Sequence, residues 1–191
     1  MADRRSPLAH LGAAVIERDD LRLVEASAVG KINLRGDPSD AAWLAAVRAA
    51  VDIDLPQASN TSNETLSLSA LWLAPDEWML VCAGGSESDV VETLEGAAKD
   101  AHSAVTDVTD AHTVFRLSGA GARDLLAKGC ALDLHPRAFG LGGVVQTLLA
   151  KATVILHQTA DDTDDAVPVF DIYVPRSFAN YLWTWLADTI Q

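Results

Sequence analysis

The sequence predicts an α+β fold built from two similar ferredoxin-like lobes, each a split βαβ arrangement with helices on one face of an antiparallel-rich sheet. Three observations lead to this prediction. The stretch from Leu34 to Ala97 reappears in diverged form between Leu117 and Ala187. Strand-like and helix-like runs follow the same order in both copies. At 191 residues, 49% of them hydrophobic, the chain can form two small fused units with real cores.

The two copies share the same turns and strands. Leu34 to Gly36 opens the first copy and Leu117 to Gly119 opens the second. The strand Trp78 to Val81 corresponds to Phe170 to Tyr173, and a helical run follows each. A repeat of this length indicates one small unit used twice. We therefore expect three parts that form one compact unit: an N-terminal arm (residues 1–20), a first lobe (21–103) and a second lobe (104–191).

The first lobe is expected to begin with two strands. Leu21 and Leu23 alternate with polar residues, as do Ile32 and Leu34, so each pair marks a strand with one face toward a core. Gly30 joins the two strands.

A helix and a hairpin follow in the first lobe. Asp37 and Pro38 predict an N-cap followed by proline at the first helical position, with the helix extending from Ser39 to Val51. Leu66 to Leu73 and Glu77 to Ala83 predict a hairpin, because proline and aspartate between them favour a tight turn. A second helix follows the hairpin.

The second lobe is expected to repeat this order. Its predicted elements are strands at 105–110 and 113–117, a helix at 122–128, a hairpin at 144–149 and 153–157, a strand at 169–174 and a closing helix at 178–190. Gly129 is expected to end the first of these helices in the left-handed conformation. The acidic run Asp161 to Asp165 is expected to lie in a mobile loop, because it is dense in like charge and lacks periodicity.

Charge and composition exclude several classes of partner. The net charge is −13, with no basic run to replace the counterions of phosphates, so the chain is not expected to bind nucleic acid or an anionic membrane surface. No apolar stretch approaches the ~20 residues that a membrane span needs. Cys82 and Cys130 lie in apolar runs of a chain without a secretory leader, which predicts reduced, buried thiols and a cytoplasmic protein.

No catalytic, cofactor-binding or metal-binding constellation is visible in the sequence. The aspartates at 161–165 lack the glycine and terminal glutamate of a calcium loop, and the five histidines lack zinc spacing. The glycines at 118–121 and 139–143 complete neither a dinucleotide fingerprint nor a nucleotide-binding loop. They are interpreted as turn and close-packing glycines.

Three residues remain as candidates for function. Asp107 and Asp110 follow an apolar strand, where a carboxylate can act as a proton relay in a cleft or, more commonly, cap a turn. Trp183 lies on the flank of the apolar stripe of the closing helix, so it is either the edge of the core or the anchor of a partner interface. It is the residue we name for such an interface.

Three segments carry a resemblance to a known family. They are the run Val105 to Gly119 with the helix and Asp133 behind it, the segment Leu71 to Leu80, and the ending Phe170 to Ala179. Together they resemble the folate-binding aminomethyltransferase superfamily, and within it the gamma-subunit family of heterotetrameric sarcosine oxidases. The resemblance covers the chain from about Leu21 onward, and its ordered series of motifs is more specific than any one of them.

The resemblance implies a non-catalytic subunit of a bacterial oxidase with alpha, beta, gamma and delta subunits. Such a complex demethylates sarcosine oxidatively to glycine, reduces oxygen to hydrogen peroxide and transfers the one-carbon unit to tetrahydrofolate. In that family FAD, FMN, NAD and the folate pocket belong to the alpha and beta subunits and zinc to the delta subunit. The gamma subunit holds no cofactor and packs mainly against alpha.

Two other functions stay open from the sequence. The chain could be a small folate-binding, aminomethyltransferase-like enzyme with Asp107 or Asp110 in its cleft, although 191 residues leave no room for the three-domain body of active aminomethyltransferases. It could also be a regulatory module that binds a small amino acid between its lobes. Solubility of the isolated chain and folate binding would separate these functions from that of an obligate subunit.

Overall fold

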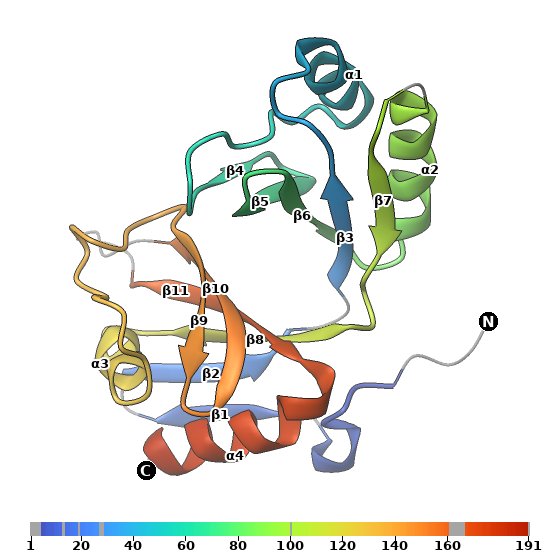
Figure 1. Ribbon diagram of the computed structural model, residues 1–191. Coiled ribbons are helices and arrows are strands. Elements are labelled where there is room, and N and C mark those ends of the chain that lie inside the picture. The colour runs from blue at the N-terminus through green and yellow to red at the C-terminus, as the bar shows by residue number, and fades with distance from the viewer. Residues whose placement is uncertain are drawn as a thin grey trace. The chain divides into compact units, whose positions relative to one another are not determined.

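The chain divides into two compact units, one of residues 27–109 and one that joins residues 1–26 to residues 110–191 (Figure 1). The structure is a computed structural model that describes residues 5–12, 14–18, 20–26, 29–99, 101–160 and 167–190. The acidic run Asp161 to Asp165, predicted as a mobile loop, lies outside these residues. Each unit is described below by itself.

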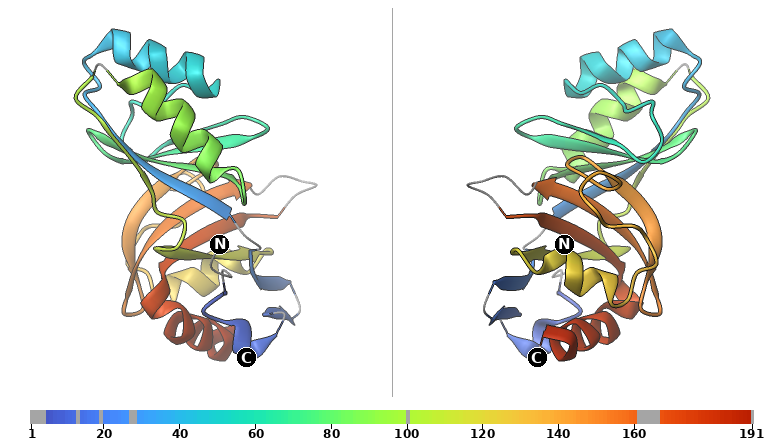
Figure 2. Two further views of the ribbon diagram at one scale, coloured as in Figure 1. Left: turned by 90° about the vertical axis from the view of Figure 1, so that its right-hand side faces the viewer. Right: turned by 90° about the vertical axis from the view of Figure 1, so that its left-hand side faces the viewer.

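The unit of residues 27–109 contains a five-stranded antiparallel sheet in the order β4-β5-β6-β3-β7. Its elements are β3 (Val29–Arg35), α1 (Ala41–Val51), β4 (Ser62–Glu64), β5 (Leu68–Ala74), β6 (Glu77–Ala83), α2 (Glu87–Ala98) and β7 (Ala104–Asp107). Helices α1 and α2 lie side by side (Figure 2). Both bury apolar side chains in one cluster with Ile32, Leu34 and Leu80 of the sheet, so they cover the same face.

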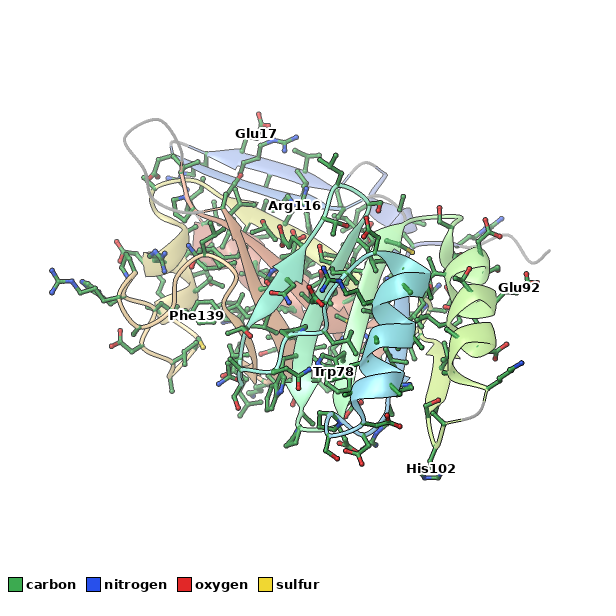
Figure 3. All side chains as sticks on the ribbon, turned by 90° about the horizontal axis from the view of Figure 1, so that it is seen from above. Glu17, Trp78, Glu92, His102, Arg116 and Phe139 are labelled. Atoms are coloured by element: carbon green, nitrogen blue, oxygen red, sulfur yellow. The ribbon has the colours of Figure 1, made fainter. Side chains whose placement is uncertain are left out.

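Two tryptophans form the centre of this core. The ring of Trp78 of β6, labelled in Figure 3, packs on the ring of Trp43 of α1 with centroids 5.7 Å apart. The indole nitrogen of Trp78 donates to the carbonyl oxygen of Pro56 at 2.8 Å. Gly36 has to be glycine, because a Cβ there would lie 2.2 Å from the ring of Trp43.

The other unit contains a six-stranded antiparallel sheet in the order β1-β2-β8-β11-β10-β9. Its elements are η1 (Ala9–Leu11), β1 (Val15–Arg18), β2 (Leu21–Glu25), β8 (His112–Ser118), α3 (Ala122–Ala127), β9 (Val144–Leu149), β10 (Ala152–Ala160), β11 (Val169–Pro175), η2 (Arg176–Phe178) and α4 (Ala179–Ile190). Leu125 of α3 and Leu182 of α4 are buried in one cluster with Phe115 and Ile172. The two helices therefore cover one face of this sheet.

The predicted fold class is confirmed. Strands β5, β6, β3 and β7 have the order of a ferredoxin-like sheet, and β10, β11, β8 and β2 repeat it in the other unit. The strands β4 and β9 extend the two sheets at equivalent edges, and α1 and α2 correspond to α3 and α4. The equivalence of Trp78 to Val81 with Phe170 to Tyr173, read from the repeat, is the equivalence of β6 with β11.

The boundaries of the units differ from those expected, because the first strand of each predicted lobe belongs to the other unit. Strand β2 pairs with β8, with Leu23 opposite Leu117, although its neighbour in the sequence is β3. Strand β7 pairs with β3, with Val105 opposite Leu34. Residues 21–26 thus belong with residues 110–191, and residues 104–109 belong with residues 27–103. Alternation predicts a half-buried strand but not the sheet edge at which it pairs.

The arm and the first helix also differ from the prediction. Residues Val15 to Arg18 of the predicted arm form β1, which pairs with β2. Helix α1 begins at Ala41, and its N-cap is Asp40, whose Oδ1 accepts from the backbone nitrogens of Ala42 and Trp43, both at 3.0 Å. Asp37, predicted as the cap, instead accepts from the nitrogen and hydroxyl of Ser39 at 2.8 and 2.7 Å. The two aspartates flank one turn, and only hydrogen-bond geometry distinguishes them.

Candidate functional site

Asp107 is the exposed last residue of β7, in the unit of residues 27–109, and Asp110 lies in an exposed turn of the other unit. Asp107 Oδ1 accepts from the backbone nitrogen of Thr109 at 2.8 Å, which is the turn-capping arrangement weighed against a proton relay. Asp110 Oδ1 lies 4.0 Å from the guanidinium of Arg176, at a side-chain exposure of 64%. Each carboxylate thus has a structural role within its own unit.

Thr109 connects the turn after β7 to strand β3. Its buried hydroxyl accepts from the backbone nitrogen of Lys31 at 3.0 Å, and the carbonyl oxygen of Lys31 accepts from Val108 at 2.9 Å. Asp107, Thr109 and Lys31 therefore hold the end of β7 against β3. No local pattern in the sequence identifies Thr109, because its partner Lys31 lies 78 positions earlier in the chain.

Trp183 lies in the core and not at an accessible surface. Only 6% of its surface is exposed, and its ring meets Phe115 edge-on at a centroid distance of 5.3 Å. The flank of the helical stripe on which it sits faces β8. The sequence left two roles open for Trp183, the edge of the core and the anchor of a partner interface. The structure supports the first, because the buried ring is not exposed to a partner.

The two glycine-rich segments are used for close packing. A Cβ on Gly119 would lie 1.6 Å from the carbonyl oxygen of Asp20, so this turn packs directly against the backbone before β2. Gly143 donates to the carbonyl oxygen of Gly140 at 2.9 Å. Arg123 stabilises the segment before Gly140, because its Nη1 donates to the carbonyl oxygens of Leu134 and Phe139 at 2.6 and 2.9 Å. These contacts support the interpretation of both segments as packing turns.

A pocket of about 580 Å³ opens beside the end of β3, but its charged groups are bonded to one another. The Arg35 guanidinium donates to Asp76 at 2.6 Å, which raises the pKa of the guanidinium. The hydrogen bonds from Ser39 lower the pKa of the Asp37 carboxyl. A ligand entering this pocket would compete with both sets of internal contacts.

Arg116 and Asp171 form an ion pair that the sequence reasoning missed. They are direct partners on β8 and β11, and two nitrogens of Arg116 donate to the two carboxylate oxygens of Asp171, each at 2.7 Å. These hydrogen bonds raise the pKa of the Arg116 guanidinium. The carboxylate has only 9% of its side chain exposed. Bidentate geometry of this kind fixes the strand register.

Metal ligands and reactive thiols give no candidate centre in the described part of the chain. No group of three or more histidine, cysteine, aspartate or glutamate side chains there could hold a metal ion. Cys82 and Cys130 are free and buried, as the sequence predicts. Burial, with added repulsion from Glu87 and Asp107, raises the pKa of the Cys82 thiol. No helix among the described residues is long and apolar enough to span a membrane.

The remaining functional feature is a set of exposed apolar side chains. In the unit of residues 1–26 and 110–191, Phe178 and Tyr181 are 41% and 38% exposed and meet edge-on at a centroid distance of 6.4 Å. In the unit of residues 27–109, Leu66 is completely exposed beside an apolar groove. Exposed apolar groups beside a concave surface are typical of protein-binding sites.

Comparisons with known proteins identify the family of the chain. The model of the sarcosine oxidase gamma subunit family matches residues 35–191. A sarcosine oxidase subunit gamma from Corynebacterium sp. (strain U-96) is 32% identical over 194 aligned positions, which span 98% of this chain and 90% of that protein. The chain belongs to the sarcosine oxidase gamma subunit family. The family assignment therefore rests on nearly the full length of the chain.

Two solved structures contain a chain with a similar fold. A chain of the heterotetrameric sarcosine oxidase from Corynebacterium sp. U-96, in complex with pyrrole 2-carboxylate, matches with a TM-score of 0.85 and 31% identity, covering 98% of this chain and 94% of that one. Aminomethyltransferase T of the glycine cleavage system from Bartonella henselae matches with a TM-score of 0.65 and 18% identity, over 96% of this chain and 56% of that one. The second match shows a shared fold.

Proposed function

We propose that this chain is the gamma subunit of a heterotetrameric sarcosine oxidase and acts in its assembly and stabilisation. The complex would demethylate sarcosine oxidatively to glycine, with hydrogen peroxide and 5,10-methylenetetrahydrofolate or formaldehyde as products. The observation that carries the proposal is the agreement of 32% identity and a TM-score of 0.85 across almost the same residues. The subunit is thus part of an oxidoreductase.

The internal use of its polar groups supports a non-catalytic role. Asp107 caps a turn, Arg35 binds Asp76, and Arg123 holds a loop. General acid or base catalysis needs a titratable group within hydrogen-bond reach of the substrate. In this chain Asp107 and Arg123 already bond to the backbone of their own units, and Arg35 is paired with another side chain.

The redox chemistry of the complex is assigned in this proposal to other subunits. Oxidation of an amine to hydrogen peroxide is flavin chemistry, in which the protein binds and orients the cofactor. A Cβ on Gly119 or Gly143 would meet neighbouring backbone, so close packing accounts for both glycines without a bound cofactor. By the family resemblance, alpha and beta hold FAD, FMN, NAD and tetrahydrofolate, and delta holds zinc. The chain would act in the cytoplasm, with alpha as its main partner.

The shared fold with aminomethyltransferase T favours one alternative, a small folate-binding protein that acts alone. The alternative requires the chain to be monodisperse by itself and to bind tetrahydrofolate. A gamma subunit should instead expose a large interface, with a total buried area on the order of 2,000 Å² on assembly, and be poorly soluble alone.

A pull-down of the tagged full-length chain from its native cells tests the proposal. Mass spectrometry would identify the co-purified chains, and the visible absorption spectrum would detect flavin. Three further subunits in a yellow eluate would support the gamma-subunit role. A colourless chain that elutes alone and binds tetrahydrofolate would contradict it and favour the alternative.

A further inference from the structure

An apolar groove of about 530 Å³ lies in the unit of residues 27–109, between the C-terminal end of α1 and the N-terminal half of α2. Leu68 and Cys82, 5% and 7% exposed, are among the residues that line it. The half-buried side chains of Val51 and Val90 line it from the two helices. We call this feature the α1–α2 groove. Every residue that lines it belongs to one unit.

Leu66 lies at the rim of the α1–α2 groove in a hydrogen-bonded turn. Its relative exposure is 110%, so the whole side chain is in solvent. The turn is held by Thr65, whose backbone nitrogen donates to the carbonyl oxygen of Leu68 at 2.8 Å. The Thr65 hydroxyl also accepts from the nitrogens of Ser67 and Leu68 at 3.4 and 3.1 Å. Because these bonds hold the backbone of the turn, a partner that covers Leu66 has to order its side chain but not the loop.

The unit that contains the α1–α2 groove is acidic, and so is one of the two helices that line the groove. Residues 27–109 contain 13 aspartates and glutamates against four lysines and arginines. Helix α2 has four acidic residues and no basic one, and Asp89 lines the groove itself. Glu92 projects from the same helix away from the sheet (Figure 3). The basic residue near the end of α1, Arg48, is 3.3 Å from Asp54.

We infer that the α1–α2 groove is the docking site for a segment of another oxidase subunit that presents a bulky apolar side chain flanked by lysine or arginine. The inference rests on the proposed function and names the surface that function would use. The apolar side chain would pack between Val51, Leu66 and Val90. The flanking cations would meet Asp89 and the other exposed carboxylates of α2. A second copy of this chain fits poorly, because it would bring two acidic rims together.

Co-expression of the full-length chain with the other three subunits tests the docking site. Leu66→Ser is expected to weaken capture of the other subunits by at least about tenfold, as loss of an interface anchor does. Leu141→Ser is the matched control, because Leu141 is also a loop leucine, 62% exposed, in the other unit. Both leucines are exposed, so neither substitution should disturb the core. An unchanged thermal unfolding midpoint would show that the variants fold.

Charge reversal provides a second, independent variant. Asp89→Lys is expected to weaken capture, and less so at high salt, since added ions screen the contact. Asp124→Lys is its control, because Asp124 is also acidic in the first turn of an exposed helix segment, in α3. The control is expected to behave like the unchanged chain.

The outcomes separate this inference from the proposed function. If the unchanged chain captures no oxidase subunit, the proposed function fails and the docking site fails with it. If the unchanged chain captures them and Leu66→Ser captures them equally well, the docking site is overturned while the proposed function stands. A dimer of the isolated chain that Leu66→Ser dissociates would also overturn the inference, because the groove would then hold a second copy.

Discussion

The structural role of a single residue depends on contacts that its sequence pattern does not specify. Asp37 and Asp40 are both good N-cap residues, and it is Asp40 that accepts from the first backbone nitrogens of α1, while Asp37 accepts from Ser39. Gly129 was predicted to adopt the left-handed conformation, but it is not among the glycines with positive φ. It is needed because a Cβ there would lie 2.5 Å from the ring of Trp185. The sequence alone identifies a helix cap near Asp37 and a required glycine at Gly129. It does not show which aspartate is the cap or which side chain requires the glycine.

Trp183 illustrates the same point for the candidate site. Truncation by Trp183→Ala is expected to lower the free energy of unfolding of the chain by about 3 to 5 kcal/mol, because it removes a buried aromatic side chain that packs on Phe115. Denaturant unfolding of the purified chain measures this loss. Trp183→Phe, which keeps an aromatic ring, should recover part of it. Weakened assembly with unchanged stability of the chain would contradict the core position.

The Cys82 thiol predicts an alkaline loss of stability. Because burial raises its pKa in the folded state, its contribution is fully present below the pKa of an unfolded thiol, about 8.5, and is lost as the pH rises through the folded pKa. The free energy of unfolding of Cys82→Ala should therefore fall less between pH 8 and pH 10 than that of the unchanged chain. Equal slopes for the two proteins would show that the thiol is not shifted.

The positions of the helices and strands were predicted more accurately than the pairing of the strands in the sheets. The hairpin of β5 and β6, the helices and the repeat were visible from periodicity and turn residues, because those signals lie within a few positions of one another. The pairing of β2 with β8 and of β7 with β3 was not visible. Nor was the Arg116 to Asp171 pair, whose members are 55 positions apart. Edge pairing depends on contacts between distant segments, for which a local pattern contains no information.

The exchange of first strands predicts which unit a core mutation destabilises. Leu23 and Leu34 are both fully buried leucines in neighbouring strands of the sequence, and each substitution to alanine should cost about 2 to 5 kcal/mol. Leu23→Ala is expected to increase hydrogen exchange in β8 and β11. Leu34→Ala, the matched variant, is expected to increase it in β3 and β6. Leu23→Ala that loosens β3 while leaving β8 protected would contradict the strand assignment.

At the scale of the whole molecule, both the sequence and the structure favour a subunit whose polar groups stabilise its own fold. The family assignment was made from an ordered series of motifs and is confirmed over nearly the full chain. The exposed surface that could bind a partner was not predicted, because exposure of Leu66 depends on the turn held by Thr65. A non-catalytic role implies that turnover of the assembled enzyme does not depend on the carboxylates of this chain.

The most direct test of that claim is the kcat of the assembled complex containing Asp107→Asn and Asp110→Asn together. Asparagine can keep the turn contact of Asp107 while removing the charge that a proton relay needs. The account predicts an intact complex whose sarcosine-dependent hydrogen peroxide production is unchanged. A fall in kcat of about a hundredfold or more with assembly intact, as expected for loss of a general acid or base, would contradict a non-catalytic role.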